Sequence, residues 1–259
     1  MFFIENKFPH SKMHTPLLSF AATVNGPASF ETARQDVLAR GGARVIRDEL
    51  RDGGFVADDK LTTGTKPLNV FARIGAGVME QPGMLVETRK LQDDRFVIAS
   101  NRPENDKHWD SDDPEWVGRA SMAKRHRFLI LRDLTWKYFN VLTFGMRDDT
   151  DTTTDTEEKE LLSAIKLLDD MEVAVHRFVA ASPDWSQDPV KIGMYFHCYG
   201  RCSVNSCHLH IIDESVLGPT FHTCSNRNLS LNDARCVLKK EFVQHVAARH
   251  GFEFPLNIG

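Results

Sequence analysis

The feature that most constrains the fold is a long amphipathic helix, which the sequence predicts over residues 154–181. Thr154 and Glu157 can form a capping box at its start, and Pro183 follows its end. The apolar positions, which recur at helical spacing, are Leu161, Leu162, Ile165, Leu168, Met171, Val175, Phe178 and Val179. A helix with one apolar face needs a partner that buries that face, so another layer must lie beside it.

Segments rich in branched and aromatic residues lie on both sides of this helix and predict a sheet. A hairpin is expected over 84–100, where apolar and polar residues alternate around Gln92, Asp93 and Asp94. Further strands are expected over 127–133, 137–145, 191–199 and 203–213, with a tight turn at Gly200 and Arg201 between the last two. The order of strands, helix and strands predicts an α+β fold, in which the helix packs on one face of an antiparallel sheet.

Both ends of the chain are predicted to be extensions of this domain. A helix from about Phe30 to Leu50 is interrupted by Gly41 and Gly42, and residues 60–67 have the composition of a linker. Near the other end, an amphipathic helix over 233–250 stops at Gly251. We therefore expect three parts, an N-terminal extension of unassigned role, a central domain, and a C-terminal loop and helix packed on the domain, at 1–67, 68–215 and 216–259.

The composition argues against several classes of partner. Hydrophobic residues make up 41% of the chain and charged residues 26%, as in ordinary soluble proteins. The formal net charge of -4 gives no overall attraction to nucleic acid or to an anionic membrane. No apolar stretch is long enough to span a bilayer, and the first residues lack a secretion signal. Because the five cysteines also favour reduced thiols, we expect a soluble protein of the cytoplasm or nucleus with no membrane partner.

The stretch SVNSCHLHII, residues 203–212, places two histidines one residue apart. Successive side chains of a strand point to opposite faces. Ser206, His208 and His210 therefore share one face, and the other face carries Cys207, Leu209 and Ile211. The apolar face can enter the core while the polar face lines a surface, so two core imidazoles are not the first interpretation.

Two kinds of chemistry fit these side chains. His197, His208, His210 and the nearby cysteines have ligand atoms suited to zinc, but the cysteine spacings differ from the paired C-x2-C pattern of common structural sites. Alternatively, an imidazole can attack an activated phosphorus while a neighbouring imidazole or hydroxyl holds the phosphate. His208, with His210, Ser203 and Ser206, supplies these parts.

The same stretch resembles the signature of the histidine triad (HIT) family, in which histidines alternate with apolar residues after a Ser-Val pair. FARIGAG (71–77) is similar to the opening segment of the family, and FLILRDLTWKYFNVLTFG (128–145) to its pair of strands. The long helix and the MYFHCYG strand fall where the family has them. The resemblance covers about residues 68–215, with an insertion at about 95–125 that includes the long charged loop at 101–116.

The resemblance implies a nucleotide hydrolase or nucleotidyl transferase that cleaves at an α-phosphate. His208 would be the nucleophile that forms a nucleotidyl-histidine, and His210 would assist phosphate binding and protonation of the leaving group. Ser203 would contact the phosphate, and Ser206 occupies the place of the first histidine of the triad. Serine can donate a hydrogen bond but cannot become a cation near pH 7. A nucleotide-binding or protein-interaction module without turnover is therefore the alternative, ahead of a zinc-binding module.

The resemblance also implies a nucleoside pocket. Asp133 and Leu134 would line it, with Phe128 or Ile130 against the base and His197 near the substrate. The implied substrate is a nucleotide or nucleotide conjugate with a phosphoanhydride, phosphoramidate or related bond, a nucleic-acid end being a further candidate. No cofactor or metal is implied, and a homodimer is a candidate assembly.

The other histidines show no pattern that pairs them with this site. His222 is interpreted as a solvated surface side chain. The histidines without a partner pattern are His10, His14, His108, His126, His176, His245 and His250.

Overall fold

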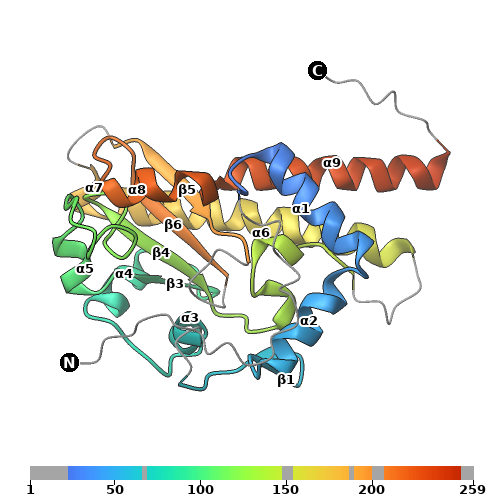
Figure 1. Ribbon diagram of the computed structural model, residues 1–259, viewed down its shortest axis with the longest axis horizontal. Coiled ribbons are helices and arrows are strands. Elements are labelled where there is room, and N and C mark those ends of the chain that lie inside the picture. Colours follow the sequence, from blue (N-terminus) through green and yellow to red (C-terminus); the bar gives the residue numbers. More distant parts are fainter. Residues whose placement is uncertain (1–22, 66–68, 148–153, 187–189, 200–206, 252–259) are drawn as a thin grey trace.

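Five strands form one antiparallel sheet in the order β3-β4-β6-β5-β7 (Figure 1). Their bounds are β3 Phe96–Ala99, β4 His126–Leu131, β5 Ile192–Phe196, β6 His208–Asp213 and β7 Leu229–Ser230. The computed structural model describes residues 23–65, 69–147, 154–186, 190–199 and 207–251. The sheet and the long helix beside it confirm the predicted α+β class.

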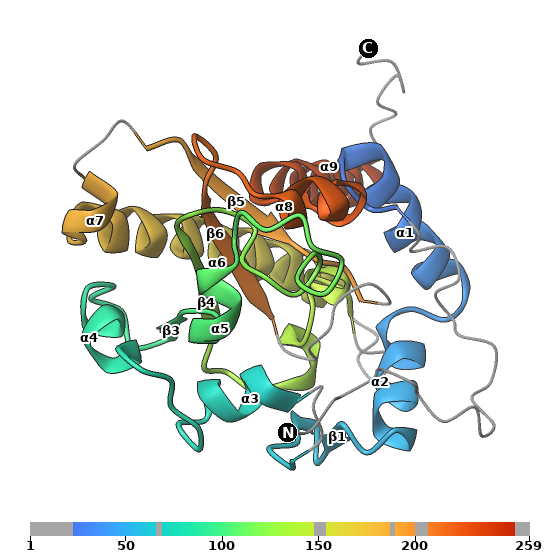
Figure 2. The same ribbon diagram turned by 60° about the vertical axis from the view of Figure 1, so that its left-hand side comes forward.

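Helix α6 (Thr154–Ala180) covers one face of the sheet, as its sequence pattern predicts (Figure 2). Leu168, Met171, Val175 and Phe178 are buried in a core that they share with the sheet. Each such side chain contributes roughly 2 kcal/mol when it leaves water. Leu162 differs from the prediction, because about half of its surface stays exposed (49%). None of the helices in the described ranges combines the length and apolar character needed to cross a membrane.

Strand alternation divides the sheet into a helix face and an opposite face. Leu129, Leu209 and Ile211 point into the core beneath α6. Phe128 and Ile130 point to the opposite face, where they pack with residues of α3 (Val70–Gly75) and α4 (Met84–Arg89). This division is the one predicted for β6, and it determines which side chains can form a site.

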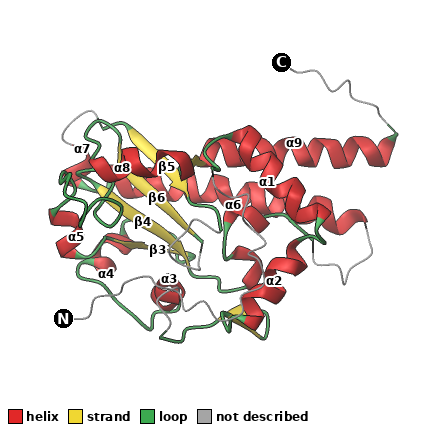
Figure 3. Ribbon diagram, in the orientation of Figure 1, coloured by secondary structure: helices red, strands yellow, loops and turns green. Residues whose placement is uncertain are grey.

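The segment over 137–145 is not the predicted strand. It forms two short 3-10 helices, η2 (Trp136–Tyr138) and η3 (Val141–Thr143) (Figure 3). The Asn140 side chain caps the second by accepting a hydrogen bond from the backbone N–H of Leu142, 3.1 Å away. Branched and aromatic residues are abundant here because the segment is buried, and burial does not require a strand.

The predicted hairpin at 84–100 is also wrong in its first half. Residues Met84–Arg89 form α4, and only β3 joins the sheet, paired with β4. Met, Leu, Glu and Arg all favour helix, so local propensity outweighed the chance alternation of apolar residues. The insertion predicted at about 95–125 is therefore wrong at its start, because residues 96–99 form the sheet strand β3. The excursion that follows carries one short helix, α5 (Pro103–Lys107).

The N-terminal helices form with the predicted break between them. α1 (Pro27–Ala39) and α2 (Ala43–Asp52) are separated at Gly41 and Gly42, whose φ angles of 117° and 72° favour glycine. Phe30 and Val37 of α1 are buried in the core shared with the sheet and α6. The predicted linker is wrong at its start, because β2 (Lys60–Leu61) pairs with β1 (Val56–Ala57).

The C-terminal helix α9 (Leu231–His250) ends at Gly251, as predicted, and begins directly after the Ser230 cap, two residues before the predicted start. It lies along α6 and α1 (Figure 1). Before it come α8 (Pro219–Cys224) and η4 (Ser225–Arg227), and α7 (Pro183–Ser186) follows α6.

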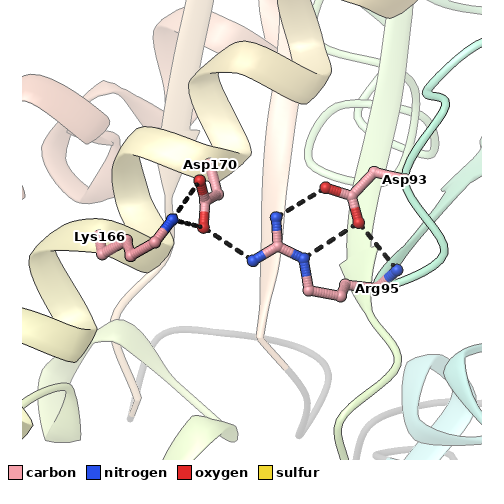
Figure 4. A network of polar contacts seen from close by, with 4 residues as sticks. All are labelled: Asp93, Arg95, Lys166 and Asp170. Atoms are coloured by element: carbon pink, nitrogen blue, oxygen red, sulfur yellow. Dashed lines mark hydrogen bonds and ion pairs between the residues drawn. The ribbon is translucent and has the colours of Figure 1, made fainter.

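An ionic network joins the start of β3 to α6 (Figure 4). The Arg95 guanidinium donates to Asp170 on α6 and to Asp93, both at 2.7 Å. Lys166 reaches the same Asp170 carboxylate from one turn away, at 2.9 Å. Arg95 is half exposed (51%), so this network positions the edge strand more than it stabilises the fold.

Candidate active site

Four imidazoles meet on the sheet face opposite α6. His208 and His210 come from β6, His126 begins β4, and His197 follows β5. The His210 ring centroid lies 4.9 Å from that of His208, 5.2 Å from that of His126 and 4.2 Å from that of His197. All four side chains are buried. His208 and His210 share one face of β6, as predicted, but the prediction that they line a surface is wrong.

His126, which shows no partner pattern in the sequence, does contact the site through His210. The antiparallel register pairs Phe128 with His210 and His126 with Ile212, which puts His126 diagonally beside His210. The signal in the sequence was the alternation of His126, Phe128 and Ile130, which lie on one face of β4. This alternation points to the site only when β4 and β6 are known to be neighbours.

Hydrogen bonds connect three of these rings in one direction. The backbone N–H of Met122 donates to Nδ1 of His126 at 3.2 Å, so the neutral His126 ring carries its proton on Nε2. That N–H faces Nδ1 of His210 at 3.0 Å, which leaves the His210 proton on its own Nε2. Nε2 of His210 in turn faces Nε2 of His208 at 3.2 Å. A single backbone amide thus sets the tautomers of His126 and His210 and directs an N–H at His208.

Burial keeps the surrounding imidazoles neutral at pH 7. Desolvation, helped by Arg127 and the other rings, lowers the pKa of His126 to about 3. Desolvation also lowers the pKa of His197 to about 3, although its hydrogen bond to Asn228 acts in the opposite direction. The pKa of His210 falls well below its usual value, first because of burial and then because of the neighbouring imidazoles and Arg227.

His197 is held by two asparagines that the sequence did not single out. Its Nε2 lies 2.8 Å from Oδ1 of Asn228, in the segment between η4 and β7. Its backbone carbonyl accepts a hydrogen bond from Nδ2 of Asn140 at 2.9 Å. These contacts fix the ring against His210.

Two phenylalanines form an aromatic wall beside His208. The ring centroid of Phe71, on α3, lies 4.8 Å from His208 and 5.0 Å from Phe128. Helix α3 approaches β4 this closely because it carries Gly75, where a Cβ atom would lie 2.7 Å from the Leu131 carbonyl oxygen. Phe128 and Ile130, the two candidates for a base contact, both lie on this face.

Asp133 and Leu134 follow β4 at the end of the sheet where β6 begins. Oδ1 of Asp133 accepts hydrogen bonds from the backbone N–H and the hydroxyl of Thr135, at 2.8 and 2.7 Å. The Leu134 carbonyl accepts from the N–H of Leu61 at 2.7 Å. They are therefore at the His208 end of the histidine row, and Asp133 is exposed.

Ser203 and Ser206 lie outside the described residues, as do Cys202 and the predicted turn at Gly200 and Arg201. Their roles stay predictions.

Two of the cysteines near the histidines in sequence point to the other face of the sheet. Cys198 and Cys207 lie in the core beneath α6, and burial raises the pKa of the Cys207 thiol. Within the described ranges, no group of three or more His, Cys, Asp or Glu side chains is arranged to hold a metal ion. His222 is exposed on α8, as predicted.

Comparisons with models of known families, with curated proteins and with solved structures find no match for this chain. Function is therefore inferred from the geometry of the imidazoles and from the sequence signature around them.

Proposed function

We propose that the chain is a nucleotide hydrolase or nucleotidyl transferase of histidine triad type, with His208 as the nucleophile. The observation that carries the proposal is the 3.2 Å contact between Nε2 of His208 and Nε2 of His210, with His210 oriented by His126. A donor N–H that is itself held by a third group is thus placed beside the attacking atom, where it can bind a phosphoryl oxygen.

The geometry suggests how the reaction proceeds. The Nε2 lone pair of His208 attacks the α-phosphorus, and the bond from phosphorus to the leaving group breaks with its electron pair on the leaving atom. The hydrogen bond from His210 must open for this attack, after which its Nε2–H is beside the new N–P bond and can bind a phosphoryl oxygen. Water or another acceptor then displaces His208 and frees the nucleotide.

The surrounding residues suit a nucleoside. Phe71 and Phe128 are buried rings next to His208, and rings of this kind can stack on a base once α3 moves away from β4. Asp133 has an exposed carboxylate at the same end of the sheet, where it can accept a hydrogen bond from a ribose hydroxyl. No cofactor or metal is needed for these steps.

The test is to detect the covalent intermediate. The purified chain is mixed with diadenosine tetraphosphate, quenched in acid and measured by intact mass, while release of nucleoside monophosphate is followed in parallel. We expect an adenylylated protein in the wild type and neither adduct nor turnover in His208→Ala. His176→Ala, which removes an exposed histidine of α6, should behave as wild type.

Two results would contradict the proposal. Equal activity of wild type and His208→Ala would show that His208 is not the nucleophile. Nucleotide binding without turnover and without an adduct would instead favour a non-catalytic binding module, the alternative that Ser206 raises.

A further inference from the structure

Hydrogen bonds join His126, His210 and His208 into a row, here called the imidazole chain. Their common direction limits whether the N–H groups of this chain can transfer a proton. Each donor points toward His208, and the chain starts at the backbone amide of Met122. A backbone amide donates a hydrogen bond but does not release its proton under these conditions. The chain therefore supplies hydrogen bonds at the site but no proton that could be transferred through it.

Transfer of the Nε2 proton of His210 to a leaving group would leave an imidazole anion in the chain. If Nε2 of His210 gave up its proton, Nδ1 would have to take one from Nε2 of His126, 3.0 Å away. His126 could not regain a proton on Nδ1, because that atom faces the Met122 N–H. The product would be a buried imidazolate anion, and an uncompensated buried charge is very costly.

A protonated ring would avoid this limit, but the surroundings oppose one. The charged groups that act on His126, His197 and His210 are arginines and the other imidazoles. No carboxylate is among these groups in the part of the chain that the structure describes. An imidazolium at any of the three positions would therefore lack the anionic partner that stabilises such a cation.

We infer that the site cleaves nucleotides whose leaving group departs without a proton, namely α-phosphoanhydrides, in preference to phosphoramidates. The inference rests on the proposed function. In an anhydride, the N–P bond to His208 forms as the P–O bond breaks, and the electron pair stays on the oxygen of the departing phosphate. In a phosphoramidate, the P–N bond breaks and the amine nitrogen must take a proton, for which the imidazole chain has no donor.

The experiment compares two probes of similar size that differ in the leaving atom. These are the 4-nitrophenyl ester of adenosine 5′-monophosphate, whose phenolate leaves unprotonated, and the corresponding N-(4-nitrophenyl) phosphoramidate. Diadenosine tetraphosphate serves as the anhydride. The inhibition constant of the phosphoramidate against the anhydride shows that it occupies the site.

We expect kcat/KM for the phosphoramidate to be at least about 100-fold below that for the ester and the anhydride, since a general acid typically supplies that factor or more. A smaller difference would overturn the inference while leaving the nucleophile in place. If none of the three probes is turned over and no nucleotidyl-histidine is trapped, the proposed function fails and the inference fails with it.

A second measurement does not depend on activity. Nitrogen-15 spectra of the histidine rings should show His126 and His210 protonated on Nε2 alone between pH 6 and 8, with assignments from His126→Gln and His210→Gln. A His210 ring that carries protons on both nitrogens in this range would overturn the inference.

Discussion

Nε2 of His126 lies 3.0 Å from Nδ1 of His210, although 84 positions separate the two residues in the chain. The β4–β6 register creates this contact, because Phe128 opposite His210 leaves His126 one diagonal step away. The orientation of a side chain on the signature strand is thus set by the neighbouring strand. His126 is a positioning residue, and its removal should affect the site through His210.

Replacing His126 separates this positioning role from simple packing. His126→Ala leaves Nδ1 of His210 and the N–H of Met122 without partners in a buried region, and should lower the free energy of unfolding by about 2–4 kcal/mol. In His126→Gln the terminal amide can still donate toward His210, so the loss should be about half as large. Urea denaturation gives the stabilities, and turnover of diadenosine tetraphosphate should lose kcat more than KM in the alanine variant. Equal effects of Ala and Gln on both measurements would contradict the positioning role.

The buried imidazoles predict a steep loss of stability in acid. Unfolded histidines titrate near pH 6.5, whereas the folded pKa values of His126 and His197 are about 3 and that of His210 is also strongly lowered. Between these values the unfolded state binds more protons, so stability is complete above pH 6.5 and falls as the pH decreases toward 3. Three such groups give a slope of at most about 4 kcal/mol per pH unit. Urea denaturation from pH 7.5 to 5 measures it.

The control for this prediction is a variant with one histidine fewer. His126→Gln should reduce the slope by about one third, because one of the three protons is no longer taken up on unfolding. A free energy of unfolding that stays constant over this pH range would show that the imidazoles are accessible and titrate in the folded protein.

The sequence predicted those features that depend on periodicity and missed those that depend on pairing. Helix α6, the break at Gly41 and Gly42, and the opposite faces of Leu209 and His210 all follow from local spacing. The segment 137–145 has the composition of a strand, yet Asn140 caps a 3-10 turn there and the segment joins neither sheet of the described residues. Propensity reports that such a segment is buried but does not identify its hydrogen-bond partners.

The same limit explains which parts of the candidate site were found. His208 and His210 are two residues apart, so their shared face could be read from one strand. His126 and Asn228 reach the cluster through sheet pairing and a distant loop, and neither contact can be read from one segment alone. The burial of the cluster was also hidden, because it results from segments outside the strand, such as α3 with Phe71 against His208 and the loop with Asn228 against His197.

Gly75 should prove necessary for the aromatic wall. A methyl group in Gly75→Ala would lie 2.7 Å from the Leu131 carbonyl oxygen, so α3 and Phe71 must shift away from His208. We expect a loss of about 1–3 kcal/mol in stability and a raised KM for the nucleotide probe. Gly64→Ala is the matched control, because nothing lies within 4 Å of the added Cβ, and it should change stability by less than about 0.5 kcal/mol. If the two variants have the same KM, the close approach of α3 does not shape the site.

Arg34 should hold the N-terminal helices to the rest of the fold. Its guanidinium binds Glu241 of α9 through two hydrogen bonds, at 2.7 and 2.6 Å, and donates to the Leu142 carbonyl at 2.8 Å. Only 1% of the Arg34 side chain and 13% of the Glu241 side chain are exposed, so Arg34→Met leaves a largely buried carboxylate and a buried carbonyl unpaired. The expected cost is about 3–5 kcal/mol in urea denaturation, and Arg34→Met combined with Glu241→Leu should recover part of it.

A neighbouring ion pair between the same two helices provides the control. Lys240 of α9 binds Glu31 of α1 at 2.8 Å, but its side chain is 53% exposed. Lys240→Met should therefore cost at most about 1 kcal/mol, because exposed pairs are screened by water. Equal costs for Arg34→Met and Lys240→Met would mean that the buried pair does not fasten α1 to α9. A much larger cost for Arg34→Met than for Lys240→Met, part of which the added Glu241→Leu recovers, would show that burial makes the contact between Arg34 and Glu241 strong.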